Sequence, residues 1–281
     1  MFSVQCPMAR GPIGVFDSGY GGLTILRQIR RLMPQYDYLY LGDNARAPYG
    51  TRSFDIVYEF TLQAVRYLFA QGCHLVILAC NTASAKALRS IQQNDLPKLD
   101  PQRRVLGVIR PTVEVVGDFS KSRHVGIMAT PGTIRSHTYE LEIAKLSPDI
   151  QVTGEACPMW VPLVENEEYD SPGADYFVRE RIVNLLRRDP LIDNVILGCT
   201  HYPLLLGKIR QFMPAGVNII EQGEYVAQSL KDYLFRHPEM TQRISEGGAA
   251  RFLTTEQAET FQAKATIFMG EPLKAERVQL I

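Results

Sequence analysis

The chain has 281 residues, of which 46% are hydrophobic and 21% are charged, so it can bury the core of one large domain or of two compact ones. Thirty basic and thirty acidic residues cancel, which excludes a strong overall field of the kind that attracts nucleic acid or an anionic membrane surface. We therefore expect a small-molecule partner, with no nucleic-acid and no membrane partner.

The N-terminal segment and the cysteines indicate a reducing compartment. The segment MFSVQCPMARGPIGVF lacks the charged and apolar parts of a secretory signal, and no apolar run in the chain reaches about 18 residues. The cysteines are odd in number and widely scattered, which favours free thiols over a disulfide framework: Cys6, Cys73, Cys80, Cys157 and Cys199. These two observations predict a cytoplasmic protein. No C-x-x-C motif occurs, so we expect no structural zinc.

Short β-rich segments alternate along the chain with helical patterns. Strands are predicted at residues 12–17, 36–43, 75–80, 104–109, 124–130, 151–157, 194–199 and 217–221, and helices at 21–33, 53–71, 174–188 and 223–237. Several of the strands are continuously apolar, which is typical of parallel strands covered by helices on both faces. The alternation predicts an α/β fold with mainly parallel sheets flanked by helices.

Two segments of the chain nearly repeat each other: LVILACNTAS at residues 75–84 and NVILGCTHYP at residues 194–203. Each reads as a buried strand that ends in a cysteine and is followed by residues able to cap a helix, Asn81 and Thr82 after Cys80 and Thr200 after Cys199. Ligands bind at the carboxyl ends of parallel strands, where helix N-termini offer N–H donors. The repeat predicts two related halves that each supply one thiol, with a pKa lowered by the helix N-terminus so that the thiol can act as a base.

The other three cysteines, Cys6, Cys73 and Cys157, are interpreted as packing residues, because free cysteine is among the most buried residue types.

A third segment, GVFDSGYGGLTILRQI, runs from an apolar strand through Asp17, Ser18 and a glycine cluster into a helix. The glycines let the backbone approach a ligand closely, so this turn is another candidate for ligand contact. They do not complete the dinucleotide-binding pattern G-x-G-x-x-G, because Thr24 occupies the place of the last glycine. The alternative is a tight turn in which Asp17 caps the helix.

From residue 12 to about 206 the chain resembles the glutamate racemases of the aspartate/glutamate racemase family. The resemblance lies in the segments FDSGYGGLT, YLGDNARAPYGTRS, ACNTAS, GVIRP, TPGTIRSHTY, CPMWVPLVE and GCTHYPLL, and continues more loosely to ARFLTT. The PYG at 48–50 separates the chain from the similar aspartate racemases. IIEQGEYVA at 219–227 departs from the family pattern, which is closer to Asp-Ser at this point.

The resemblance implies two pseudo-symmetric α/β domains with the active site between them. Because GVIRP and IIEQG read as strand ends followed by turn residues, we place the first domain at residues 1–110, completed by 222–281, and the second at 111–221. The implied reaction is the cofactor-independent interconversion of L-glutamate and D-glutamate, which supplies D-glutamate for peptidoglycan and so serves cell-wall biogenesis and cell shape. A homodimer is the candidate assembly.

The implied mechanism needs a base and an acid on opposite faces of the amino acid, and two facing cysteines provide both. By resemblance, Cys80 takes the α-proton from D-glutamate and is assisted by Asp17. Cys199 takes it from L-glutamate and is assisted by His201 and Glu165. The implied substrate-binding residues are Asp17, Ser18, Asn81, Thr82, Thr130, Thr133, Thr200 and His201, with Tyr49 and Gly50 near the side-chain carboxylate.

Plainer interpretations stay open at this point. His201 could be an ordinary residue at the start of a helix, and Glu165 lies in the acidic run ENEEYD, which by composition is a solvated loop. Cys199 and His201 could also belong to a metal site, but no third ligand is evident, so we expect no metal.

Other functions also remain open. The alternatives are an aspartate racemase, a decarboxylase or hydrolase with a single nucleophilic cysteine, an amino-acid binding protein, and a pyridoxal-phosphate racemase. The last would need a reactive lysine, and nothing around Lys86 or Lys208 singles one out.

Overall fold

The computed structural model describes residues 9–280, so Cys6 and the first half of the N-terminal segment discussed above lie outside the described residues. All the paired strands run parallel and form two sheets. The first sheet has the order β10 (Ala275–Arg277), β9 (Ala250–Thr254), β2 (Tyr38–Gly42), β1 (Ile13–Asp17), β3 (Leu75–Leu78) and β4 (Arg104–Gly107). The second has the order β6 (Gln151–Ala156), β5 (His124–Ala129), β7 (Asn194–Gly198) and β8 (Asn218–Ile220). The predicted α/β fold with parallel sheets flanked by helices is confirmed.

All eight predicted strands form, each shorter than predicted at one or both ends, and the largest difference is at 36–43, where the strand spans Tyr38–Gly42. The strand predicted at 104–109 ends at Gly107, because the chain turns into helix α6 at Ile109. Strands β9 and β10 were not predicted. Strand β9 is only partly buried, and β10 is three residues long and largely exposed, so neither has a long apolar run that marks it in the sequence.

The two sheets share one strand order. The order β2-β1-β3-β4 of the first sheet is repeated as β6-β5-β7-β8 in the second. Strands β3 and β7 hold equivalent places. Cys199 follows β7 directly, and Cys80 follows β3 after one residue, Ala79. In sheets of this order, ligands bind outside the carboxyl ends of the strands, at the place where the strand order reverses. Here that place lies between β1 and β3 in the first sheet and between β5 and β7 in the second. The two similar sequence segments therefore occupy equivalent positions in the two sheets.

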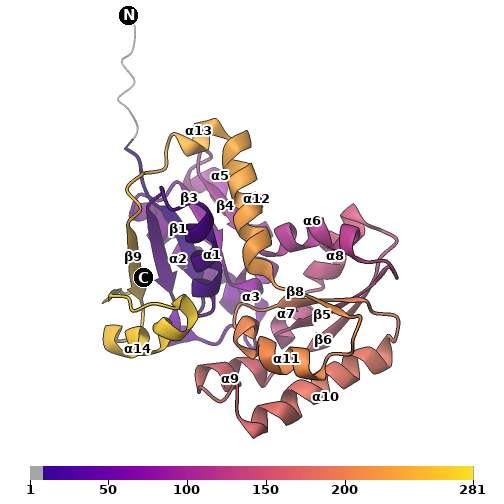
Figure 1. Cartoon of the computed structure of the whole chain (residues 1–281). Coiled ribbons are helices and arrows are strands. Elements are labelled where there is room, and N and C mark those ends of the chain that lie inside the picture. The colour runs from indigo at the N-terminus through magenta and orange to yellow at the C-terminus, as the bar shows by residue number, and fades with distance from the viewer. Residues whose placement is uncertain (1–8, 281) are drawn as a thin grey trace, which may run out of the picture.

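Helices cover both sheets (Figure 1). The long helices are α1 (Gly22–Leu32), α2 (Phe54–Ala70), α6 (Ile109–Phe119), α8 (Thr138–Leu146), α10 (Pro172–Arg188), α12 (Gln222–Arg236) and α14 (Ala258–Met269). Shorter ones are α3 (Asn81–Lys86), α4 (Leu88–Ser90), α5 (Leu96–Leu99), α7 (Pro131–Arg135), α9 (Trp160–Glu165), α11 (Leu206–Phe212) and α13 (Pro238–Thr241), with single turns at Asn44–Arg46, Ile91–Asp95 and Tyr202–Leu205. The four predicted helices form as α1, α2, α10 and α12.

The core explains how the two sheets are held together. Strands β1, β2, β3 and β7 are buried along their whole length, as their continuous apolar sequences require. Helix α1 buries Leu23, Leu26 and Ile29 and packs against α12, the helix that follows the last strand of the second sheet. The largest apolar cluster contains residues that surround both sheets, so the core is continuous across their junction.

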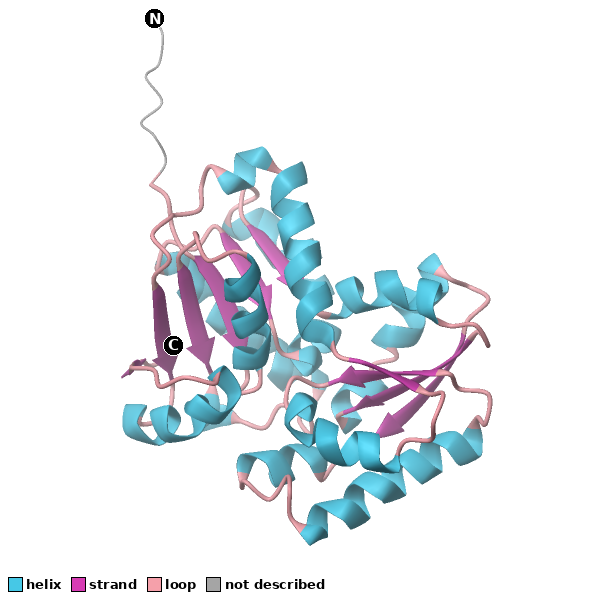
Figure 2. Ribbon diagram, in the orientation of Figure 1, coloured by secondary structure: helices cyan, strands magenta, loops and turns pink. Residues whose placement is uncertain are grey.

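The carboxyl ends of both sheets face the region between them, as the arrowheads in Figure 2 show. Loops that follow strands of either sheet therefore meet at one place. Within residues 9–280, no helix is both long and apolar enough to cross a membrane.

Candidate active site

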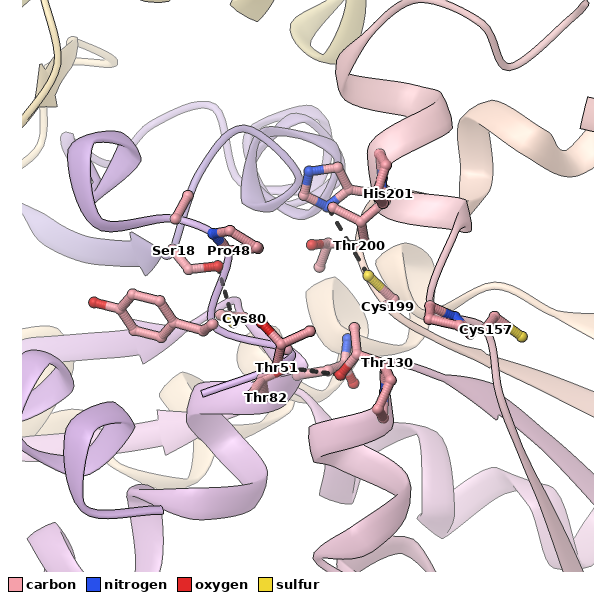
Figure 3. Close-up of a pocket in the computed structure, with 18 of the residues that line it drawn as sticks. Ser18, Pro48, Thr51, Cys80, Thr82, Thr130, Cys157, Cys199, Thr200 and His201 are labelled. Carbon is pink, nitrogen blue, oxygen red and sulfur yellow. Dashed lines mark hydrogen bonds between the residues drawn. The ribbon is translucent and has the colours of Figure 1, made fainter. Parts of the chain in front are cut away.

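A cavity lies where the carboxyl ends of the two sheets meet (Figure 3). Eleven of the thirteen predicted site residues line it: Ser18, Tyr49, Gly50, Cys80, Asn81, Thr82, Thr130, Glu165, Cys199, Thr200 and His201. Asp17 and Thr133 are not among the residues that line the cavity. Both are buried, and each lies within hydrogen-bond distance of a residue that lines it, Asp17 of Thr200 and Thr133 of Thr82.

The first thiol, Cys80, follows β3 and itself caps helix α3. Its Sγ accepts the backbone N–H of Ala83 at 3.4 Å and lies 3.4 Å from Oγ of Ser18. The sequence predicted that Asn81 and Thr82 would supply the cap. The cysteine does so because its sulfur accepts the backbone N–H of the third residue of the helix, as a serine hydroxyl does at other helix starts.

Burial raises the pKa of the Cys80 thiol to about 12, and the nearby Asp17 carboxylate adds to this, although the contacts with Ser18 and Ala83 oppose it. The predicted lowering of its pKa is therefore wrong for this cysteine. Helix α3 is only six residues long, and its N–H donors do not compensate for the loss of water around a thiolate. In the ligand-free protein Cys80 is a thiol, which is the form needed of an acid.

The second thiol, Cys199, follows β7 and has a charged neighbour. Nδ1 of His201 lies 3.9 Å from its Sγ, and Nε2 of the same ring lies 3.1 Å from Oε1 of Glu165. Burial alone would lower the pKa of His201, but the contacts with Cys199 and Glu165 raise it to about 10. At neutral pH the imidazolium places a positive charge next to Cys199.

Helix α14 contacts both His201 and Glu165, although no sequence motif predicted this role. The ring of Phe268 packs edge-on against His201, with 5.3 Å between the ring centroids. Nζ of Lys264 donates to the backbone carbonyl of Glu165 at 2.8 Å, at the last residue of α9. A cation at a helix C-terminus satisfies a free carbonyl and opposes the negative end of the helix dipole.

Asp17 joins the two halves of the site from behind the cavity. Its Oδ1 accepts the backbone N–H of Gly19 at 2.8 Å, and its Oδ2 accepts the Thr200 hydroxyl at 3.4 Å. Burial raises the pKa of Asp17, and the positive charge of His201 acts in the opposite direction. The charge of Asp17 also acts on the Cys80 thiol, whose pKa it raises.

Three threonine hydroxyls lie within hydrogen-bond distance of one another. Oγ1 of Thr82 lies 2.9 Å from that of Thr130 and 3.3 Å from that of Thr133, and the last two are 3.1 Å apart. Thr130 also caps α7. Thr82 and Thr130 line the cavity, and Thr133 holds them in place.

The loop at 47–51 lines the cavity. Within it, the Tyr49 hydroxyl donates to the buried carboxylate of Asp43. The Gly50 carbonyl accepts the backbone N–H of Gly132 at 2.7 Å, and a Cβ on Gly50 would lie 2.8 Å from Cβ of Thr130. Only glycine allows the loops of the two halves to approach this closely.

Some lining residues were not predicted. Pro48 and Thr51 flank the predicted Tyr49 and Gly50 in the same stretch of sequence. Cys157 also lines the cavity, but its Sγ points toward the carbonyl of Glu155 at 3.7 Å, and Figure 3 shows this sulfur directed away from Cys199. Among residues 9–280, no three histidine, cysteine or acidic side chains cluster as a metal site requires.

Comparisons with known proteins agree on one family. The family profile described as Asp/Glu/Hydantoin racemase matches residues 22–230. A glutamate racemase of Paracoccus denitrificans (strain Pd 1222) is 42% identical over 274 residues, which cover 94% of this chain and 98% of that protein.

Two solved structures show the same architecture. Glutamate racemase isoform RacE1 from Bacillus anthracis has a TM-score of 0.87 and 33% identity, and the match covers 96% of this chain and 98% of that one. Glutamate racemase from Francisella tularensis subsp. tularensis SCHU S4, in complex with D-glutamate, has a TM-score of 0.85 and 32% identity over the same shares of the two chains.

Proposed function

Because this chain belongs to the Asp/Glu/Hydantoin racemase family, we propose that it interconverts L-glutamate and D-glutamate, with two cysteines as acid and base. The observation that supports this most strongly is the placement of Cys80 and Cys199 in one cavity, after equivalent strands of two equivalent sheets. A hydrolase or decarboxylase with a single nucleophilic thiol would need only one of them.

In the proposed reaction, the thiolate of Cys199 takes the α-proton of L-glutamate. The C–H bond breaks, an S–H bond forms, and the electron pair stays on the substrate. Cys80 then gives its proton to the opposite face of the α-carbon, which forms D-glutamate and leaves Cys80 as thiolate. The reverse reaction uses the two residues in exchanged roles.

The charges around the two sulfurs support these roles. The imidazolium of His201, held by Glu165, stabilises negative charge on Cys199. Burial and the charge of Asp17 keep Cys80 protonated. A bound substrate must lower the cost of the carbanion, and fixed donors in a water-poor cavity are the usual means.

The polar lining supports binding of an acidic amino acid. Ser18, Thr82 and Thr130 offer hydroxyl groups near Cys80, and Thr200 lies next to Cys199. We propose that these groups, with Asn81, hold the α-amino and α-carboxylate groups. The backbone at Tyr49 and Gly50 then faces the side-chain carboxylate.

We further propose that the reaction needs no cofactor and supplies D-glutamate for peptidoglycan. Both thiols must stay reduced, which favours work in the cytoplasm. The proposed domain division also has support. The first sheet takes its strands from residues 13–107 and 250–277, and the second from 124–220, on either side of the proposed boundaries at 110 and 222.

The test is a substrate panel in deuterated water. The L and D forms of glutamate, aspartate and glutamine are incubated with the protein and followed by circular dichroism and by proton NMR of the α-position. We expect both glutamate enantiomers to racemise with uptake of deuterium, and aspartate to react poorly. Equal rates for aspartate and glutamate would contradict the assignment of substrate, and no exchange with any of the six compounds would contradict a racemase function.

A matched control separates the two cavity thiols from thiols in general. Cys73 is buried and lies outside the cavity, and burial raises its pKa to about 12. Replacing it by serine should leave racemisation in place, whereas the same change at Cys80 or Cys199 should abolish it.

A further inference from the structure

Gln222 is a buried residue in the segment where the sequence departs from the family pattern. It is the first residue of α12 and is only 4% exposed. It follows β8, at the point where the chain leaves the second sheet and enters the helix that packs on α1. Its carboxamide contacts four residues.

The backbone carbonyl of Val108 determines the donors and acceptors in these hydrogen bonds. The Val108 carbonyl can only accept, so Nε2 of Gln222 must face it, at 3.2 Å. Oε1 of Gln222 therefore faces Asn81 and accepts from Nδ2 at 2.7 Å. This orientation leaves Oδ1 of Asn81 to accept the Tyr139 hydroxyl at 2.8 Å. Nε2 of Gln222 also lies 2.9 Å from the Tyr139 hydroxyl and 3.1 Å from Oγ1 of Thr112.

The network fixes the side-chain amide of Asn81 on two sides. Tyr139 holds its oxygen and Gln222 holds one of its two N–H groups. Asn81 follows Cys80 directly and lines the cavity. Its second N–H is then available to an acceptor inside the cavity, and its orientation is set by Gln222 and Tyr139.

The same network joins the two places where the chain passes between the sheets. Val108 and Thr112 lie at the start of α6, where the chain leaves the first sheet after β4. Gln222 lies where the chain returns after β8. Helices α6 and α12 pack against each other (Figure 1).

We propose that Gln222 is a positioning residue for catalysis: it holds Asn81 in the orientation that donates a hydrogen bond to a carboxylate of the substrate. The proposal rests on the proposed function. A buried side-chain amide whose oxygen and nitrogen both have hydrogen-bond partners has one stable orientation, and loss of one partner leaves it poorly held. Gln222 thereby connects the start of α6, at the junction of the two sheets, to Asn81 in the cavity lining.

The first test replaces Gln222 by methionine, which keeps the length of the side chain and removes both polar atoms. We expect kcat/KM for glutamate to fall about 10-fold to 100-fold, the range that a hydrogen bond to a charged group supports. The matched control is Gln228→Met on the exposed face of the same helix, where the side chain bonds Asp232, and it should match the wild type. A Gln222→Met protein that loses thermal stability but keeps its kcat/KM would show a purely structural role and overturn the proposal.

A double-mutant cycle tests whether Gln222 acts through Asn81. In an Asn81→Ala background, Gln222→Met should lower kcat/KM by less than about 2-fold, because the group that it positions is already gone. The same 10-fold or larger loss in both backgrounds would contradict the proposal.

Gln222→Glu provides a second variant if the methionine protein does not fold. A buried carboxylate would face the Val108 carbonyl, whereas the protonated acid could donate to it. The activity of this variant relative to wild type should rise as the pH falls, and a ratio independent of pH would count against the proposed orientation.

A readout without turnover separates this proposal from the proposed function. Failure of the wild type to racemise glutamate would count against the function alone. In nitrogen-15 NMR spectra of the ligand-free protein, the side-chain amide signals of Asn81 should move in Gln222→Met and stay in place in Gln228→Met. Unmoved Asn81 signals in Gln222→Met would overturn the positioning role whatever the protein's substrate.

Discussion

Replacing Glu165 by glutamine tests the electrostatics of the site most directly. The change keeps the size of the side chain next to His201 and removes its negative charge. In the wild type, Oε1 of Glu165 lies 3.1 Å from Nε2 of His201, and the His201 pKa is raised to about 10 by its contacts with Cys199 and Glu165, against the effect of burial. We expect the pKa of His201 to be lower in the Glu165→Gln variant than in the wild type.

The size of the effect follows from the geometry. Two opposite unit charges 3.1 Å apart interact by about 5 kcal/mol at an effective dielectric constant of about 20. The Glu165 side chain is 24% exposed, and solvent screening reduces this to about half. Since about 1.4 kcal/mol corresponds to a tenfold change in a proton equilibrium, the midpoint of the His201 titration should fall by about two pH units.

The assay is an NMR titration of protein labelled with carbon-13 at histidine Cε1. The chain has five histidines, and a His201→Asn sample identifies the signal. Glu168→Gln, on an exposed residue of the loop that follows α9, serves as the control and should leave the midpoint unchanged. A Glu165→Gln midpoint within about 0.3 pH units of wild type, a difference below half a kcal/mol, would refute the account of this ion pair.

Three further predictions concern the thiols, a glycine and stability. Cys80→Ser and Cys199→Ser should each abolish racemisation in both directions, because a serine hydroxyl is far less acidic than a thiol. With substrates that carry a leaving group next to the α-carbon, which need one deprotonation, Cys80→Ser should still act on the L form and Cys199→Ser on the D form. A shared preference for one enantiomer would contradict the two-base mechanism. Gly21→Ala would place a Cβ 2.5 Å from Nδ1 of His201, so it should destabilise the protein by about 1–3 kcal/mol in urea unfolding and lower activity. Gly207→Ala, whose Cβ meets no atom within 4 Å, should be neutral or slightly stabilising, and similar losses in both variants would argue against the clash. Because the folded-state pKa of His201 is raised from 6.5 to about 10, its charge stabilises the fold below about pH 6.5, and this contribution is lost as the pH rises to about 10. The difference in unfolding free energy between wild type and His201→Asn should shrink over that range, and a constant difference would show that the charge does not stabilise the fold.

The sequence by itself determined the local features of this protein. The apolar runs predicted the eight strands of the two four-strand sets, because a strand buried on both faces needs consecutive apolar residues. The cysteine at the end of each of two such runs predicted Cys80 and Cys199 as partners at strand ends, and the structure brings both to one cavity. These features depend on neighbours within about ten residues, which the sequence displays directly.

Only the tertiary structure decided how distant residues act on one another. It joined Glu165 to His201, although the acidic run around Glu165 reads as a solvated loop. It also placed Gln222 on Asn81 and showed that burial and Asp17 raise the pKa of Cys80, which the local helix start was expected to lower. Burial and Coulomb interactions depend on which elements pack together in three dimensions, and residues 36 or 141 positions apart carry no local signal of such a contact.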